Sequence, residues 1–363
     1  METVYQGEIR YRQYLSTSGA ALGELPDWTD DPGWLTGCYR NMVLARALDN
    51  KAIALQRTGQ LGTYASLLGS EAIDIPVGML MTSDDVLVPY YRNHAIQMLR
   101  GMPIEEILLY WGGDERGNAS QAMNQDFPNA VPIATQATHA CGVATAMKLR
   151  AEKRVAVTLC GDGATSKGDF LESLNVAGAW QLPVVFVVNN NQWAISVPRA
   201  LQNGAPTLAQ KALGAGIRGE QVDGNDPIAV RAAFELALER ARDGKGPTLI
   251  EAISYRLSDH TTADDATRYR ENDELKKAWE REPVKRLRTF LHQQGWWDET
   301  QETSWKDEVN GMIQSAVDRY LATPPQAVES IFDHLYAELP EQLQEQRDWA
   351  MVKAMKGGTH HES

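Results

Sequence analysis

The chain has few cysteines and no long apolar run, and both shortages narrow what kind of protein it can be. Its three cysteines, Cys38, Cys141 and Cys160, lack CxxC spacing, so we expect neither a disulfide framework nor a cysteine-held metal cluster. No apolar stretch approaches the roughly 20 residues of a membrane-spanning helix. The segment METVYQGEIRYRQYL carries acids and no hydrophobic signal region, so we expect a cytoplasmic protein without a membrane partner.

The chain also has fewer positively charged residues than negatively charged ones. The 35 Lys and Arg residues are outnumbered by 48 Asp and Glu, and the net charge of −13 argues against nucleic acid or an anionic membrane as partner. The sequence contains no internal repeat and no low-complexity linker. With 43% hydrophobic and 23% charged residues, it has ample material for a globular core. Its 363 residues would allow two average domains or one large α/β domain with appendages.

Residues 154–196 predict a strand, a helix and a second strand in succession. The first strand is the apolar run Val155–Cys160, and the second is the β-branched run Val184–Val188. Between them, residues 169–180 have helical spacing. The apolar face of this helix comprises Phe170, Leu174, Ala177 and Trp180. Such a unit places two parallel strands side by side through a right-handed crossover.

Polar residues follow both strands, Gly161-Asp162-Gly163 after the first and Asn189-Asn190-Asn191 after the second. Either motif alone is usually a turn or the start of a loop, but both at the ends of one unit indicate a site. The carboxyl ends of parallel strands about 4.8 Å apart share the ligand-binding edge of the sheet. Asp162 and Asn191 can therefore converge on one Mg²⁺ ion that also holds a phosphate. The two glycines let the backbone approach that phosphate closely.

The rest of the chain predicts an α/β fold. Alternating strands and helices over residues 60–256 indicate a mostly parallel sheet flanked by helices. We expect residues 1–34 to form an N-terminal arm, residues 35–272 the α/β domain, and residues 273–363 a helical extension packed on that domain. Long irregular segments, of a kind that often serves binding, are expected at residues 111–132, 197–216 and 256–271.

Together these motifs resemble those of the α subunits of thiamine-dependent 2-oxo acid dehydrogenases, the decarboxylating first components of their complexes. The likeness extends over roughly residues 35–345 and implies a thiamine diphosphate-binding fold. Besides the Gly-Asp-Gly and Asn-Asn pair, it rests on Gly69-Ser70-Glu71-Ala72, Tyr91-Arg92, Ala134-Thr135-Gln136, Val222-Asp223-Gly224-Asn225-Asp226, Ser254-Tyr255-Arg256, residues 259–265, Tyr269-Arg270 and residues 336–340. Several independent motifs in the family's order make the resemblance strong.

The resemblance implies a site for thiamine diphosphate and Mg²⁺. Asp162 and Asn191 would be side-chain ligands of the metal, and the backbone carbonyl of Trp193 would be a third ligand. Gly163 and Ala164 would offer backbone N–H groups to the diphosphate.

Other matching positions would surround the rest of the cofactor. Tyr91 and Arg92 match the pair that reaches the diphosphate, where an arginine supplies planar, charge-assisted donors. Val131 and Ile133 match backbone and apolar contacts around the aminopyrimidine. His260 matches the active-site histidine of a mobile loop, which makes it the candidate proton donor or charge partner near a developing oxyanion.

Some positions leave details open. Pro132, Thr135 and Gln136 match a potassium-binding turn found in some relatives. Ala65 stands where mitochondrial pyruvate-specific relatives carry an active-site histidine, and Asn189 stands where other relatives carry Arg, Glu or Gln. These departures leave the substrate and the contacts to the diphosphate unsettled, but they do not affect the expected cofactor.

The reaction implied is oxidative decarboxylation of pyruvate with reductive acetylation of the lipoyl group of an acyltransferase component. The alternatives are an α subunit of a branched-chain 2-oxo acid dehydrogenase or acetoin dehydrogenase, and, from another class, a non-catalytic Mg²⁺-diphosphate-binding regulatory subunit. Activation of thiamine needs a carboxylate against the aminopyrimidine, for which this chain offers no convincing candidate. In the family that glutamate lies on a β subunit, so we expect an α₂β₂ assembly bound to the lipoyl acyltransferase core.

Overall fold

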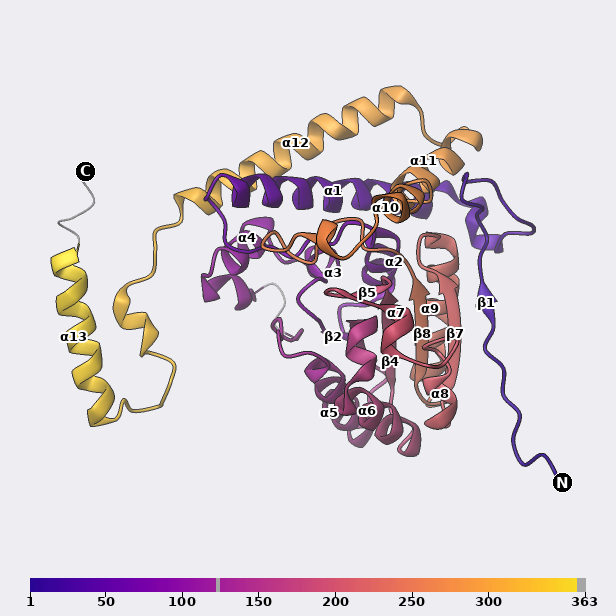
Figure 1. Ribbon diagram of the computed structural model, residues 1–363, viewed down its shortest axis with the longest axis horizontal. Helices are drawn as coiled ribbons and strands as arrows, with labels where there is room; N and C mark the ends of the chain where they lie inside the picture. The colour runs from indigo at the N-terminus through magenta and orange to yellow at the C-terminus, as the bar shows by residue number, and fades with distance from the viewer. Residues whose placement is uncertain (122–124, 358–363) are drawn as a thin grey trace. The chain divides into compact units, whose positions relative to one another are not determined.

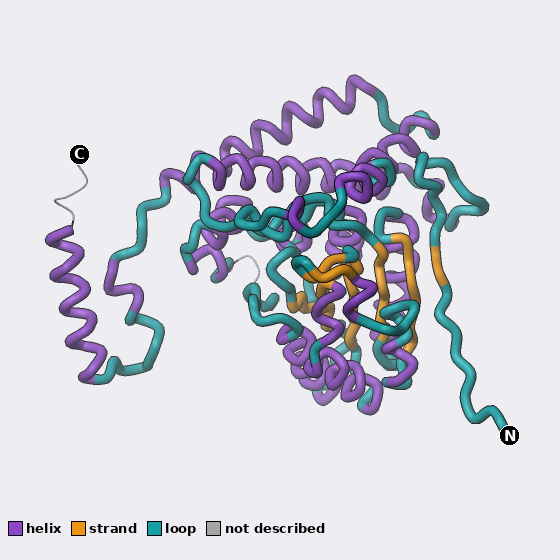
Figure 2. Tube along the Cα trace, in the orientation of Figure 1, coloured by secondary structure: helices purple, strands orange, loops and turns teal. Residues whose placement is uncertain are grey.

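The computed structural model describes residues 1–121 and 125–357. Its contacts divide the chain into two compact units, residues 1–318 and the residues from 319 onward. The first unit contains the sheet and the helices packed on it (Figures 1 and 2). The second contains the end of α12 (Glu299–Ala322), the short 3-10 helix η6 (Val328–Ile331) and α13 (Glu341–Gly357). The expected domain boundaries at residues 34 and 272 stay a prediction.

The main sheet has six strands, all parallel, and this confirms the expected α/β fold. The strands are ordered β1-β7-β8-β4-β3-β2 across the sheet. Their bounds are β1 Tyr11–Arg12, β2 Val86–Val88, β3 Ala156–Gly161, β4 Val184–Asn190, β7 Arg218–Asp223 and β8 Thr248–Ile253. The central strands β3, β4 and β8 are almost wholly buried, as expected for a parallel sheet covered on both faces.

Helices cover both faces of the sheet, and each layer buries its own apolar cluster. One cluster joins the sheet to α5 (Thr135–Leu149), α6 (Gly168–Ala179) and α8 (Lys211–Gly214). The other joins it to α2 (Glu71–Leu80), α3 (His94–Leu99) and α9 (Pro227–Arg242). The sheet therefore lies between two helical layers, and its carboxyl edge is left for ligands.

The predicted strand, helix and strand of residues 154–196 are confirmed as β3, α6 and β4. The two strands pair in parallel, with Gly161 opposite Asn189. Phe170, Leu174 and Ala177 are buried as expected. The prediction for Trp180 was wrong, because this residue caps the carboxyl end of α6 and its side chain is 57% exposed.

The N-terminal arm is attached to the edge of the sheet. Tyr11–Arg12 forms β1 and pairs in parallel with β7. The Asp226 carboxylate accepts hydrogen bonds from the backbone N–H groups of Tyr14 and Leu15 at 2.6 and 2.7 Å. The same side chain caps α9 by accepting from Ile228 and Ala229. This part of the Val-Asp-Gly-Asn-Asp motif therefore has a structural role after β7, where it holds the N-terminal arm and caps α9.

The first unit also contains a long helix, α1 (Pro32–Arg57), which packs on α2. α1 is a single helix that begins at the cap residue Asp31. Arg46 of α1 forms ion pairs with Glu71 of α2 and with Glu282, at 2.8 and 2.7 Å. α11 (Pro283–Gln293) packs against both α1 and α2. The unit also contains α4 (Ile104–Trp111) and α10 (Asn272–Trp279). In the described part of the chain, no helix combines the length and apolar character needed to cross a membrane.

The segments expected to be irregular contain short elements. Residues 111–132 include the 3-10 helix η2 (Glu115–Asn118), and three of them lie outside the described residues. Residues 197–216 contain the strand β6 (Val197–Pro198) and the helices α7 (Arg199–Gln202) and α8. The strand β6 pairs with β5 (Trp193–Ala194). Residues 256–271 are a loop with one 3-10 turn, η5 (Ala266–Arg268).

Candidate active site

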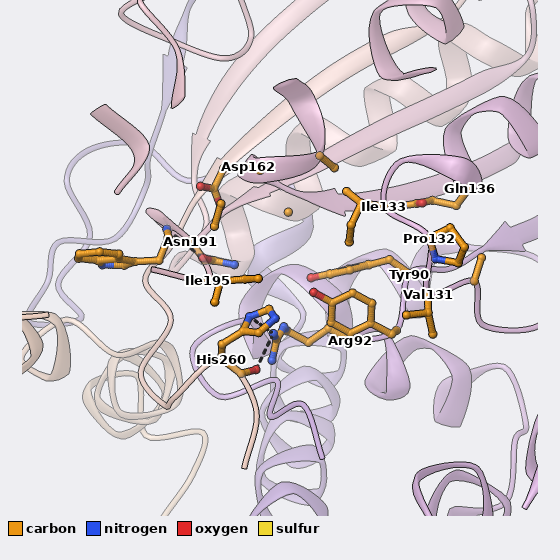
Figure 3. Close-up of a pocket in the computed structure, with 17 residues that line it drawn as sticks. Tyr90, Arg92, Val131, Pro132, Ile133, Gln136, Asp162, Asn191, Ile195 and His260 are labelled. Carbon is orange, nitrogen blue, oxygen red and sulfur yellow. Dashed lines mark hydrogen bonds between the residues drawn. The ribbon is translucent and has the colours of Figure 1, made fainter. Parts of the chain in front are cut away.

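A cavity of about 220 Å³ lies at the carboxyl edge of β3 and β4 (Figure 3). Every residue expected to bind thiamine diphosphate or Mg²⁺ lines it. These residues are Tyr91, Arg92, Val131, Ile133, Asp162, Gly163, Ala164, Asn191, Trp193 and His260. Of the expected potassium turn, Pro132 and Gln136 also line the cavity, whereas Thr135 does not.

Asp162 directly follows β3 and is the first residue of the 3-10 turn η4 (Asp162–Ser166). The residue is buried, with 1% of its surface exposed. Its Oδ2 accepts a hydrogen bond from Gln202 Nε2 at 2.7 Å, whereas its Oδ1 has no partner within the described residues. Burial raises the pKa of this carboxyl, because ionising an acid that is removed from water costs free energy. A cation beside Oδ1 would offset that cost.

Asn191 and Trp193 follow β4 in a tight turn. Asn191 Oδ1 accepts a hydrogen bond from the Trp193 backbone N–H at 3.2 Å, and Gln192 between them has a φ of 73°. The neighbouring Asn190 is fixed by its Nδ2, which donates to the buried Glu251 at 2.6 Å. The turn thus brings an amide oxygen and a backbone carbonyl to the edge where Asp162 lies. This set of hard oxygen donors fits Mg²⁺.

Gly163 is required by the close approach of two turns. A Cβ atom at this position would lie 2.7 Å from the Ala194 Cβ, which is closer than real Cβ contacts. The absence of a side chain lets η4 pack against β5 beside the cavity. The first turn of a helix also leaves backbone N–H groups without helical partners, and such groups can bind a phosphate oxygen.

Arg92 and His260 meet on the opposite wall (Figure 3). Arg92 is 3% exposed, and its guanidinium donates to the Ser66 carbonyl and, at 3.0 Å, to the His260 carbonyl. His260 Nδ1 lies 3.4 Å from Arg92 Nη2 and 3.5 Å from Arg256 Nη1. Burial, followed by the charges of Arg92 and Arg256, lowers the pKa of His260 to about 4. His260 is therefore neutral at neutral pH.

The tautomer of His260 follows from these neighbours. Both groups that face Nδ1 are guanidinium N–H donors, which have no lone pair to offer. Nδ1 must therefore be the acceptor, and the proton of the neutral ring lies on Nε2.

Arg256 is a site residue to which the sequence motifs assigned no role. It is buried, and it donates to the backbone carbonyls of Trp193 and Ile195 at 3.4 and 2.9 Å. It also donates to the Tyr269 hydroxyl at 2.8 Å. Arg256 thus connects the turn after β4 to the loop that carries His260. Its place three residues after the buried strand β8, within a recognised motif, was the signal that could have revealed it.

The two departures from the family pattern lie outside the cavity lining. Asn189 is fully buried, donates to Ser70 Oγ at 2.7 Å and accepts from Ser254 Oγ at 2.5 Å. It therefore ties the strand ends to the start of α2. Ala65 is buried next to Ser66, the residue whose carbonyl holds Arg92. His94 is fully buried and packs against the rings of Tyr64 and Trp111, which also contact each other.

The fold is that of a doubly wound α/β protein. At its strand ends, one cavity is lined by oxygen donors that fit a cation and by a buried arginine. The family model described as "Dehydrogenase E1 component" matches residues 39–329. The chain therefore belongs to the dehydrogenase E1 component family, the thiamine diphosphate-dependent family that its motifs resemble.

Individual relatives are similar over nearly the whole chain. A Bacillus subtilis protein named "Pyruvate dehydrogenase E1 component subunit alpha" is 40% identical over 338 residues, 92% of this chain and 90% of the relative. A Staphylococcus aureus protein of the same name is 39% identical, covering 97% and 95%. A Mycobacterium tuberculosis protein named "3-methyl-2-oxobutanoate dehydrogenase subunit alpha" is 42% identical, covering 87% and 85%.

Proposed function

We propose that this chain is the α subunit of a pyruvate dehydrogenase E1 component, which decarboxylates pyruvate oxidatively and acetylates a lipoyl group on an acyltransferase. The observation that carries the proposal is the meeting of the Asp162, Asn191 and Trp193 oxygen donors with Arg92 and His260 around one cavity. Two of the relatives described above are named as pyruvate dehydrogenase E1 α subunits. We expect the protein to act in the cytoplasm.

The unpaired oxygen of Asp162 supports a divalent cation in this cavity. Asp162 Oδ1, the Asn191 amide oxygen and the Trp193 carbonyl would hold Mg²⁺. The diphosphate would be held by Tyr91, by Arg92 and by the backbone of the turn Gly163-Ala164. Ile133 and Val131 would contact the aminopyrimidine.

A potassium ion at the turn of residues 132–136 is a further part of the proposal. Gln136 Nε2 donates to the Leu159 carbonyl at 3.0 Å, and its Oε1 is buried without a partner among the described residues. A buried, unpaired amide oxygen is suited to a cation. Thr135, the remaining expected ligand, does not line the cavity.

When bound, thiamine diphosphate supplies the nucleophilic carbon and the sink for the electrons released with CO₂. The protein's part is to orient substrate and to move protons. His260 carries its proton on Nε2 and is fixed through Nδ1, so Nε2–H can donate to an oxyanion that develops on the substrate. Arg92 fixes the His260 backbone and adds positive charge on the same wall.

A second polypeptide would complete the site. Val131, Ile133 and Ile195 lie around the cavity with 61%, 42% and 55% of their surfaces exposed. Asp162 is the one carboxylate among the described residues that line the cavity, and in this proposal it binds the metal. The acid that activates the aminopyrimidine would therefore come from a β subunit, which would also cover the apolar mouth in an α₂β₂ assembly on a lipoyl acyltransferase core.

A branched-chain 2-oxo acid is the second candidate substrate, because the mycobacterial relative is named for 3-methyl-2-oxobutanoate. Release of CO₂ by the chain assembled with its β subunit distinguishes the two. We expect kcat/KM to be highest for pyruvate and lower for 3-methyl-2-oxobutanoate. A higher kcat/KM for the branched acid would favour the second candidate. If neither acid releases CO₂ in a thiamine-dependent reaction, both candidates are wrong.

A further inference from the structure

Gln202 reaches the cavity acid from a different loop. It is the last residue of α7, and its Nε2 donates to Asp162 Oδ2 at 2.7 Å. The same nitrogen donates to the Val197 carbonyl at 3.0 Å. Because both neighbours of Nε2 are acceptors, the orientation of the amide is determined, and nitrogen rather than oxygen faces Asp162. Neither the sequence motifs nor the family resemblance assigned this residue a role.

Because of this contact, the two carboxylate oxygens of Asp162 have different surroundings. Oδ2 is engaged by Gln202, whereas Oδ1 is buried and has no partner in the described part of the chain. A carboxylate held in this way offers a metal one oxygen. Mg²⁺ requires near-ideal octahedral geometry and accepts a single oxygen well, whereas Ca²⁺ is larger and readily takes both oxygens of a carboxylate.

The donor to Asp162 is neutral, and this matters for a cation site. Within the described residues the side chain that donates to Asp162 is the uncharged Gln202, and the nearest cationic influence on the acid is the charge of Arg256, which forms no ion pair with it. Gln202 can therefore orient the acid without cancelling its charge. An arginine or lysine in the same place would orient it equally well but would repel Mg²⁺.

We propose that Gln202 is a positioning residue that fixes Asp162 for single-oxygen ligation and so sets the preference of the site for Mg²⁺ over Ca²⁺. The proposal rests on the proposed function, because it assumes that Asp162 binds the metal of a metal–diphosphate cofactor. It extends that function by assigning metal selectivity to a residue outside the ligand set.

Replacing Gln202 should leave the loop folded. The Gln202 carbonyl accepts a hydrogen bond from Ser166 Oγ at 3.3 Å, which holds α7 on η4 through the backbone. Arg199 also ties the loop to itself by donating to the carbonyls of Asn203 and Ala205. Neither interaction uses the Gln202 side chain. Methionine has a similar length and no N–H donor, so Gln202→Met removes the contact to Asp162 with little change in packing.

The test uses the chain assembled with its β subunit and measures thiamine diphosphate binding by equilibrium dialysis, with either Mg²⁺ or Ca²⁺ titrated. Loss of a hydrogen bond to a charged group should raise the Mg²⁺ concentration for half-maximal binding by roughly tenfold or more in Gln202→Met. The Ca²⁺ requirement should change much less, so the preference for Mg²⁺ falls. The matched control is Gln210→Met, in the same loop, whose side chain accepts from the Thr207 N–H and makes no contact with Asp162.

An equal rise for both metals would overturn the proposal, because it would show that Gln202 only supports the loop. An unchanged requirement for both metals would overturn it as well. Gln202→Ala repeats the measurement if the methionine variant does not assemble, and the same loss of preference is expected. If the parent complex binds thiamine diphosphate without any divalent metal, the proposed function itself has failed, and that result is visible before any variant is made.

Discussion

At the scale of single residues, the cavity is built from side chains with one atom held and another left for a ligand. Asp162 has Oδ2 on Gln202 and Oδ1 unpaired. His260 turns Nδ1 toward two guanidinium groups and carries its proton on Nε2. Each group is therefore oriented before anything binds, which lowers the cost of organising the site.

Asp162→Ala should abolish Mg²⁺-dependent binding of thiamine diphosphate, because it removes the one charged ligand expected for the metal. Titration calorimetry on the complex measures this directly. The control is Asp169→Ala, which removes a half-exposed acid that pairs with Lys167 on the first turn of α6. An unchanged cofactor affinity in Asp162→Ala would disprove the metal site.

His260→Ala should preserve folding and much of the cofactor affinity but lower the rate of decarboxylation or acetyl transfer. A positioned acid–base group typically contributes about 10² to 10⁴ in rate. The rates are compared at saturating cofactor, with His292→Ala, on α11, as the control. If the His260 variant turns over within a few-fold of the parent, His260 is not a catalytic residue.

The lowered pKa of His260 also predicts a pH dependence of stability in the cofactor-free chain. The unfolded chain takes up this proton near pH 6.5, whereas the folded chain takes it up only near pH 4. Acidification through this window therefore favours unfolding, and the stability linked to neutral His260 is lost as the pH falls. The thermal midpoint of His260→Ala should consequently fall less than that of the parent between pH 7 and pH 5. An equal fall would contradict the lowered pKa.

At the scale of elements, two loops from distant parts of the chain close around the strand ends. The loop of residues 197–216 reaches Asp162 through Gln202, and the loop of residues 256–271 carries His260. The second loop is held by the Thr262 N–H, which donates to the Tyr64 carbonyl at 2.8 Å, and by Tyr64 N–H, which donates to Thr262 Oγ1 at 2.9 Å. The first loop also has a buried apolar anchor in Leu208, and the second has one in Leu257. We therefore expect only the polar stretches of these loops, which include Arg199 and Arg268, to open more easily than the sheet.

We therefore expect thiamine diphosphate with Mg²⁺ to protect both loops from proteolysis. Trypsin should cleave after Arg199 and Arg268 more slowly when the cofactor is bound, because the anion gives Arg92 and His260 a ligand. Cleavage after Arg10, in the arm, is the internal control. Equal cleavage of the two loops with and without cofactor would argue against cofactor-linked ordering.

The elements that could be predicted from sequence are those specified by local pattern. β3, α6 and β4 follow from strand-length apolar runs and helical spacing. β1 was missed because its two residues are held by pairing with β7 rather than by their own periodicity. α3 was missed because a six-residue helix has too little periodicity to detect. Trp180 was misplaced because the helix ends just before it.

The same distinction applies to the site. Asp162 and Asn191 could be paired from sequence because they end adjacent strands of one unit. Gln202 could not, because its contact depends on how the loop after β5 folds back onto η4. The role of Arg256 depends on carbonyl groups of another loop, which no local pattern specifies. Sequence thus identified the residues at strand ends and missed those that orient them.

At the scale of the whole molecule, the cavity holds only some of the groups that the proposed reaction needs. Its lining has oxygen donors of a kind that fits a cation, a buried arginine and a histidine, but no second carboxylate among the described residues. The apolar residues at the mouth remain exposed. A partner that covers them would supply the missing acid and tighten cofactor binding at the same time, as expected for an obligate interface.

Thiamine-dependent CO₂ release from pyruvate, measured for the isolated chain, for the β subunit and for their mixture, tests this account most directly. The account predicts release only from the mixture, dependent on Mg²⁺ and lost when the mixture contains Asp162→Ala. Release by the isolated chain would contradict the assignment as an α subunit, and full release by a mixture containing Asp162→Ala would contradict the site.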